Sequence, residues 1–160
     1  MVVLVVVSLS LCAQTYPPQS TPHLEFVVQL RVHIDNAYTV GDTPHGKRII
    51  IPITGGTFEG PRLKGTILPG GADYQLANAD GTRTELEAIY SIQTDDGTRI
   101  HVRNRGLVCD NHSSYYFMTA PQFEAPADSP YAWLNNALYV CQPEWTQAFA
   151  GIVLNVWMVK

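Results

Sequence analysis

The sequence predicts a single all-β domain, a closed antiparallel up-and-down barrel of about eight or nine strands with at most one short helix. Three observations predict it. Apolar and polar residues alternate over long segments, turn residues recur roughly every ten positions, and no long segment has the helical period. The 160 residues suffice for one core and are too few for two. A closed barrel is favoured because the expected strands are long and closure removes exposed edges.

The composition excludes two classes of protein. Ten lysines and arginines face 14 acidic residues, for a net charge of −4, so clustered positive charge for nucleic-acid binding is missing. Hydrophobic residues make up 46% and charged residues 15% of the chain, against roughly 25% charged in ordinary domains. Such a chain must bury much of its length, so a disordered protein is excluded.

Residues 1–13 are expected to lie outside the fold, as a signal peptide or another non-core extension. Their apolar run is too short to span about 30 Å of hydrocarbon as a helix, but has the length of a signal-peptide core. A mis-assigned start or a buried extra strand are the alternatives. Residues 14–21 then form a linker, and residues 22–160 form the barrel. We expect a secreted protein with no stable membrane span, and leave a homodimer open.

Two further features fit an oxidising compartment. Asn111 begins an Asn-His-Ser tripeptide, the acceptor pattern for N-glycosylation, in a polar stretch typical of a loop. If Cys12 leaves with a signal peptide, Cys109 and Cys141 remain as an even pair. A disulfide between them would contribute about 3 to 4 kcal/mol by the chain-entropy estimate. Two buried free thiols are the alternative.

The first half of the domain should contain four strands separated by turns. The earliest alternates without a break over twelve residues, which is typical of a long half-buried strand. Gly55 and Gly56 follow the second strand and are expected to let the chain bend at a barrel corner. Turns are expected at 42–46, at 69–71 and at 78–81. The four strands are residues 23–34, 48–53, 62–68 and 72–77.

The second half should contain a hairpin, a further strand, one short helix and two closing strands. Asp95-Asp96-Gly97 joins the two hairpin strands. Ser129 followed by proline is typical of a helix start, so the helix is placed at 129–136. The strands are residues 82–94, 99–108, 115–120, 137–141 and 150–159.

The register of that hairpin decides which polar groups face the interior. With a three-residue loop and Gly97 in the left-handed conformation, Tyr90 and Asn104 face inward. A loop of two or four residues shifts the pairing by one and places His101 and Arg105 on the apolar face. The first register buries no arginine and is preferred. It pairs Thr94 with Thr98, Ile92 with Ile100, Tyr90 with Val102, Ala88 with Asn104 and Glu87 with Arg105.

Several blocks of the sequence resemble the domain-of-unknown-function 3237 family. Residues 53–65 (ITGGTFEGPRLKG) and 68–75 (LPGGADYQ) resemble its central signature. Later blocks follow in the same order, and the similarity covers roughly residues 22–160. The resemblance implies a small antiparallel β-barrel and brings no established catalytic residues. The later blocks are residues 94–97, 100–106, 123–124 and 131–135.

No metal site and no cofactor are expected. The cysteines form no closely spaced ligand pair, and no helix is available to present two histidines to a metal. Gly55 and Gly56 are not followed by a crossover helix that could bind a dinucleotide phosphate. No serine lies in a glycine-flanked nucleophile elbow. The histidines, which show no ligand spacing, are His23, His33, His45, His101 and His112.

Four polar residues are the candidate catalytic groups. Asp73, Glu59, Tyr90 and Asn104 are expected to converge at one end of an apolar cavity. Burial there would raise the pKa of a carboxyl and let it exchange a proton near neutral pH. Each has a structural alternative: a turn residue, a solvated carboxylate or a satisfied core polar group. The candidate ligand-binding residues are Tyr74, Phe117 and Trp133.

Three functions fit this prediction. The first is a cofactor-independent enzyme that isomerises, cyclises or eliminates within an apolar small molecule, by acid-base catalysis or by confinement alone. The second is a secreted barrel that binds a hydrophobic molecule without changing it. The third is a structural domain whose barrel is filled by side chains. Gly65, Ala88 and Gly106 leave room inside and favour a cavity.

Overall fold

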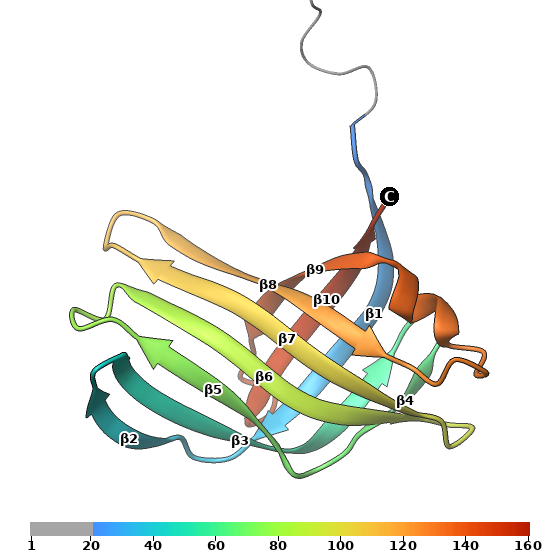
Figure 1. Ribbon diagram of the computed structural model, residues 1–160, viewed down its shortest axis with the longest axis horizontal. Coiled ribbons are helices and arrows are strands. Elements are labelled where there is room, and N and C mark those ends of the chain that lie inside the picture. The colour runs from blue at the N-terminus through green and yellow to red at the C-terminus, as the bar shows by residue number, and fades with distance from the viewer. Residues whose placement is uncertain (1–20) are drawn as a thin grey trace, which may run out of the picture.

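Antiparallel strands occupy most of residues 21–160, the part of the chain that the computed structural model describes (Figure 1). The expected signal peptide and nearly all of the expected linker lie outside these residues. The elements are β1 (Leu24–Ile34), β2 (Tyr38–Thr43), β3 (Gly46–Glu59), β4 (Lys64–Ile67), β5 (Gly71–Ala77), β6 (Arg83–Thr94), β7 (Arg99–Asp110), β8 (Tyr115–Glu124), the 3-10 helix η1 (Ala132–Asn136), β9 (Leu138–Trp145) and β10 (Gly151–Val159).

The strands close into a ring, which confirms the predicted barrel. Their order is β1-β10-β9-β8-β7-β6-β4-β3, and antiparallel pairing of β3 with β1 closes it. Strands β4 and β5 both lie between β3 and β6, one beyond the other along the wall. Strand β2 pairs with the first part of β3 only. The result is an eight-strand barrel with two extra strands.

Strand β3 differs most from its prediction, because it continues through Gly55 and Gly56. Both glycines have positive φ, and a Cβ on Gly56 would lie 2.0 Å from the carbonyl oxygen of Arg31. Across them the inward-facing residues change from odd-numbered to even-numbered: Ile53 is buried before the glycines and Phe58 after them. The two glycines therefore let the strand bend and change which side chains face the interior.

Three elements outside the hairpin, β2, η1 and β9, also depart from expectation. Strand β2 has no predicted counterpart, because the sequence after residue 34 was expected to hold only a turn. The expected helix is a single 3-10 segment, η1, and β9 extends four residues beyond its predicted end at Cys141. Within residues 21–160 no helix has the length and apolar character needed to cross a membrane.

The central hairpin has the preferred register. The backbone N–H of Thr94 donates to the Thr98 carbonyl at 2.9 Å, and Gly97 has a φ of 89°. Tyr90 therefore pairs with Val102, and Ala88 pairs with Asn104. The three-residue loop thus determines which polar groups enter the barrel.

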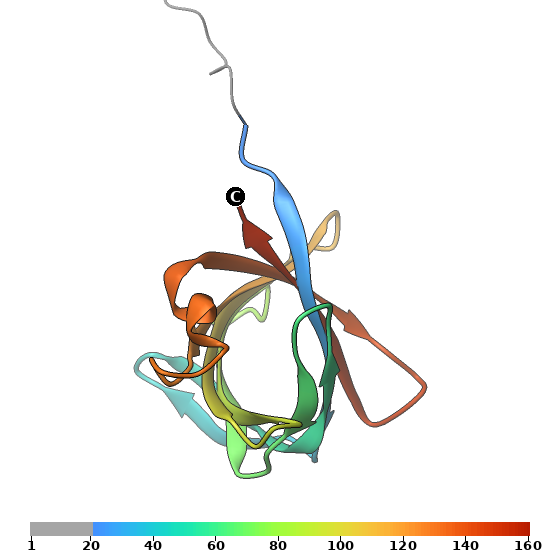
Figure 2. The same ribbon diagram turned by 90° about the vertical axis from the view of Figure 1, so that its right-hand side faces the viewer.

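Core side chains fill one end of the barrel, the end that faces the viewer in Figure 2. This filled end includes the turn at residues 95–98 and the connection that carries η1. Leu134 of η1 is 1% exposed and packs into the same apolar cluster. The cluster there also contains Val28, Phe58, Leu63, Ile67, Ile92, Ile100, Phe123, Tyr139 and Val156.

The predicted disulfide is wrong, because Cys109 and Cys141 are both free thiols. Strand β8 lies between their strands: Cys109 on β7 pairs with Tyr116, and Cys141 on β9 pairs with Thr119. Two strand spacings of about 4.8 Å each exceed the Cα separation of a disulfide, which stays below about 7 Å. The pair of cysteines that remains when Cys12 is set aside carried no information about strand order.

Replacing Leu134 by alanine tests the role of η1 at the filled end. We expect Leu134→Ala to lower the free energy of unfolding by about 2–5 kcal/mol, because it leaves a cavity in a packed core. Urea denaturation followed by circular dichroism measures the change. The matched control is Leu138→Ala, because Leu138 is 75% exposed and its truncation should stay within about 0.5 kcal/mol. Equal effects of the two substitutions would contradict this account of the core.

Candidate functional site

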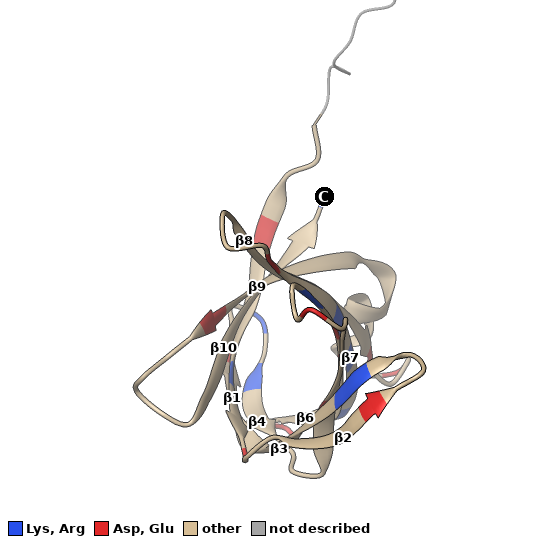
Figure 3. Ribbon diagram, turned by 90° about the vertical axis from the view of Figure 1, so that its left-hand side faces the viewer, with Lys and Arg blue, Asp and Glu red and all other residues tan. Residues whose placement is uncertain are grey.

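The other end of the barrel is hollow. Figure 3 looks along the barrel from this side. The hollow and its open mouth contain about 570 Å³ free of protein atoms, of which about 70 Å³ can hold the centre of a water-sized molecule. The enclosed part is smaller than the roughly 300 Å³ at which ligand pockets begin, so a ligand of metabolite size would also occupy the open mouth. Its polar side chains are Asp73, Gln75, Tyr90, Asn104 and Thr119, and the other lining residues, such as Ile51, Leu86 and Leu154, are apolar.

A break in the β5–β6 ladder holds Asp73 in place. Asp73 pairs with Ala88, but the regular pairing resumes only at Leu76 with Glu85. In the gap, the backbone N–H of Glu87 donates to Asp73 Oδ1 at 3.1 Å. Gln75 Nε2 donates to Asp73 Oδ2 at 2.7 Å. Both carboxylate oxygens are therefore oriented by hydrogen bonds from the wall.

The hollow surrounds Asp73 with apolar side chains and no cation. Burial raises the pKa of the Asp73 carboxyl, and the hydrogen bonds from Gln75 and from the Glu87 backbone oppose that rise only in part. Among residues 21–160, no lysine, arginine or histidine lines the hollow. Of the described residues that line the hollow, Asp73 alone has an ionisable carboxyl, so it determines the charge of this lining.

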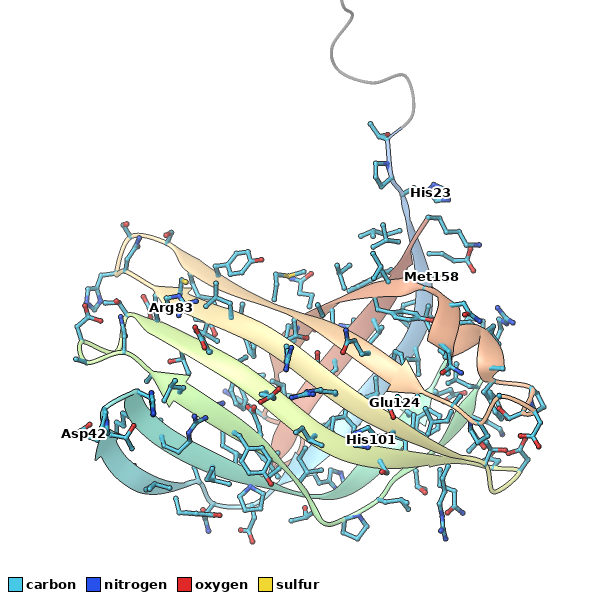
Figure 4. The ribbon with its side chains drawn as sticks, in the orientation of Figure 1. His23, Asp42, Arg83, His101, Glu124 and Met158 are labelled. Atoms are coloured by element: carbon cyan, nitrogen blue, oxygen red, sulfur yellow. The ribbon has the colours of Figure 1, made fainter. Side chains whose placement is uncertain are left out.

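The cations of the neighbouring strands lie on the outer surface. Arg103 and Arg105 both bind Glu87 there, at 2.7 and 2.9 Å, and hold the pKa of that carboxyl below its ordinary value. Figure 4 labels His101 on β7 and Glu124 on β8, a cross-strand pair on the same outer face. The register keeps these charges away from Asp73.

Tyr90 forms the boundary between the hollow and the filled end, since it lines the hollow and belongs to the core cluster. Burial, and secondarily the nearby Cys141 and Asp73, raise the pKa of its hydroxyl far above the ordinary value. Tyr90 therefore stays protonated and can donate a hydrogen bond at any physiological pH. Gly71 lies against it, and a Cβ there would meet the Tyr90 Cβ at 2.5 Å.

Two buried polar atoms beside the hollow have no hydrogen-bond partner in the structure. They are Asn104 Oδ1 and Thr119 Oγ1, on side chains that are 4% and 7% exposed. Asn104 is separated from Asp73 by the strand that carries the small Ala88. Leaving buried polar groups unpaired costs free energy of folding. Such atoms next to a cavity are typical of a binding site.

The structure brings together three of the four candidate catalytic residues. Asp73, Tyr90 and Asn104 all line the hollow, whereas Glu59 is exposed on the outer face near the filled end. Glu59 follows Phe58, the residue that faces inward after the glycine bend. The expected convergence therefore holds without Glu59.

Only one of the three candidate ligand-binding residues borders the hollow. Phe117 lines it. Tyr74 is exposed on the outer face of β5, and Trp133 is part of η1, where the Arg62 guanidinium sits 3.9 Å from the ring centre. Trp133 thus belongs to the filled end.

Among the polar and aromatic residues that line the hollow, sequence reasoning missed Gln75, Thr119 and Trp145. Strand alternation could have found the first two, since Gln75 lies two residues after Asp73 and Thr119 two after Phe117. Trp145 needed the true end of β9, which the sequence pattern placed too early. Within residues 21–160 no three histidine, cysteine or acidic side chains are grouped to hold one metal ion.

A barrel that is packed at one end and hollow at the other defines a class of small single-domain proteins able to enclose one ligand. Within that class the chain belongs to the family described as protein of unknown function DUF3237, whose model matches residues 22–159. It is 35% identical over 132 residues to a UPF0311 protein of Clostridium acetobutylicum, covering 73% of this chain and 82% of the relative. A β-barrel-like protein of Acinetobacter baumannii, 31% identical, superposes with a TM-score of 0.79 over 91% of this chain and 100% of that one.

Two fungal relatives have names that refer to metabolism. A hydroalkoxylation enzyme, phnH, of Penicillium herquei is 32% identical over 115 residues, covering 72% of this chain and 70% of the relative. A protein of the PR-toxin biosynthesis cluster of Penicillium roqueforti is 34% identical over 163 residues, covering 81% and 86%. The family thus includes a protein named as an enzyme.

The raised pKa of Asp73 predicts a pH-dependent effect on stability. Folding raises this pKa above its unfolded value of 3.8, so the folded state binds the proton more tightly and stability falls as pH rises through that interval. We expect Asp73→Asn to raise the melting temperature at pH 7, and this gain to vanish as pH falls to about 3.8. Thermal melts from pH 3.5 to 8 measure it. Asp128→Asn, at an exposed site, is the control; a gain that does not change with pH would contradict the prediction.

Proposed function

We propose that this protein is a cofactor-independent enzyme that binds an apolar small metabolite in the hollow and closes or isomerises it by moving a proton. One observation carries the proposal: Asp73, a carboxyl with a raised pKa, is held by Gln75 and the Glu87 backbone within an otherwise uncharged, mostly apolar hollow. A carboxyl of this kind populates both protonation states closer to neutral pH than an exposed one.

The name of the Penicillium herquei relative supports addition of an O–H group to a C=C bond as the reaction type. Hydroalkoxylation adds an alcohol O–H across a C=C bond, so the oxygen loses a proton while one carbon gains one. In an intramolecular case the product is an isomer of the substrate. Asp73 can serve both transfers: its acid form donates a proton to carbon, and the carboxylate so formed accepts the proton of the attacking hydroxyl. The carboxyl ends the cycle in its starting form.

Tyr90 and Asn104 are proposed to orient the substrate. The protonated Tyr90 hydroxyl can donate a hydrogen bond to a substrate oxygen, and the Asn104 amide can bind a second polar group. The apolar wall holds the remaining atoms in a folded shape, which can itself lower the barrier to ring closure by several kcal/mol. Confinement thus adds to proton transfer.

A non-catalytic barrel that binds a hydrophobic molecule is the second candidate. The apolar lining and the unpartnered Asn104 Oδ1 would serve binding alone equally well. Turnover distinguishes the two.

In either case we propose secretion and N-glycosylation at Asn111, which is exposed in the β7–β8 turn and accepts a hydrogen bond from Ser113 Oγ at 2.9 Å. A homodimer also stays a prediction.

Substitution of Asp73 tests the enzyme. Alkenyl phenols of several chain lengths serve as substrates, and mass spectrometry coupled to chromatography detects cyclic products of unchanged mass. In D₂O the product should carry one carbon-bound deuterium. Asp73→Asn should lower kcat by about 10²–10⁴-fold, because proton transfer is lost. Asp128→Asn is the exposed carboxylate control. Full turnover by Asp73→Asn would remove this carboxyl from the mechanism.

Substitution of Tyr90 tests the orienting role. Tyr90→Phe removes one hydroxyl and keeps the ring that closes the hollow. We expect kcat to fall about tenfold or more, with little change in the dissociation constant of a neutral apolar dye, because the lost donor acts on the reacting oxygen. Tyr38→Phe, on the exposed strand β2, is the control. A loss of dye binding with unchanged kcat would instead make Tyr90 a binding residue.

A further inference from the structure

The barrel wall has one weak seam, between β8 and β9. A single residue pair, Thr119 with Cys141, joins these two strands. The neighbouring ladders are continuous: β7–β8 pairs from His101 with Glu124 to Asp110 with Tyr115, and β9–β10 pairs along all of β9. In Figure 1, β8 and β9 separate on either side of the place where they meet.

Two prolines explain why the pairing of β8 with β9 does not extend beyond one residue pair. Extending the register from the Thr119–Cys141 pair places Pro143 opposite Phe117 and Pro121 opposite Tyr139. Proline has no backbone N–H, so neither position can donate a ladder hydrogen bond. A proline thus lies two residues from the single pair in each direction, once on each strand.

The two halves of the seam are covered differently. At the filled end, η1 covers the gap: Leu134 is buried in the core, and the Asn135 side chain hydrogen-bonds both the N–H and the carbonyl of Ala125. At the hollow, aromatic rings face each other. The Phe117 and Trp145 ring centres are 6.4 Å apart at 37°, and Trp145 is 62% exposed.

We propose that a ligand enters the hollow at the side of its mouth that the open half of the β8–β9 seam forms, with Phe117 and Trp145 as the gate. Both residues line the hollow, as do Thr119 and Pro143 from the same two strands. Along the continuous β7–β8 and β9–β10 ladders, widening the wall would break backbone hydrogen bonds. Here rotation of two side chains suffices, a motion that is fast compared with local unfolding. The absence of cations at the gate and in the hollow suits a neutral, apolar molecule.

This proposal shares with the proposed function only the assumption that the hollow holds a ligand. It requires no particular chemistry at Asp73. Binding kinetics therefore test it independently of turnover, with the neutral dye N-phenyl-1-naphthylamine as the probe and its fluorescence followed by stopped flow.

Opening the gate is the first arm of the test. Trp145→Ala should raise both the association and the dissociation rate of the dye by about tenfold, because the same barrier limits entry and exit. A residue that only contacts the bound dye would change the dissociation rate alone. The matched control is Tyr116→Ala, an exposed aromatic residue on the outer side of β8, which should leave both rates unchanged.

Closing the seam is the second arm. Met118 and Gln142 are the next residues along the strands from the single pair toward Phe117 and Pro143. They lie opposite each other in the extended register. Met118→Cys with Gln142→Cys, in a Cys109→Ser background, allows cross-linking by a short bis-maleimide across the outer face. The cross-linked protein should take up dye about tenfold more slowly than the same protein with its thiols blocked singly.

Three outcomes are decisive. Association rates that stay unchanged in both arms would overturn the entrance at this seam. Absence of dye binding by the unaltered chain would overturn the hollow as a ligand site, and with it the proposed function. Gated dye binding together with no turnover of any substrate would support the entrance and count against the enzyme.

Discussion

Closure of the strand ring is the constraint on which the rest of the structure depends. A barrel wall satisfies its backbone groups only by pairing each strand on both sides, and this chain does so along most of its circumference. Besides two β-bulges in β1, the wall departs from regular pairing in the β5–β6 gap at Asp73 and at the β8–β9 seam. Both departures border the hollow, so the irregular backbone and the candidate chemistry coincide.

In the β5–β6 gap, a side-chain carboxylate takes the place of a backbone carbonyl as the hydrogen-bond acceptor. A ladder N–H at Glu87 would normally point to a carbonyl of β5, but here it donates to the Asp73 carboxylate. The wall thereby stays satisfied while a carboxyl is held against an apolar hollow. Burial in the hollow raises the pKa of Asp73, and the hydrogen bonds that fix its orientation oppose that rise only in part.

The sequence was informative where local chemistry decides the structure. Gly97 specified a three-residue loop, and the loop specified that Tyr90 and Asn104 face inward. It was uninformative where a local irregularity or a long-range neighbour decides. Glu59 could not be placed because the bend at Gly55 and Gly56 reverses the alternation. The false disulfide has the same origin, since spacing along the chain does not reveal which strands are neighbours.

The division of the barrel into a packed end and a hollow end separates two selective demands on one small domain. Residues around Leu134 must keep their volumes, because a core of this size has little free energy to spare. Lining residues at the opposite end can change size and polarity with less penalty to folding. A scaffold arranged in this way can acquire new ligand preferences through few substitutions at the hollow end, while the packed end continues to stabilise the fold.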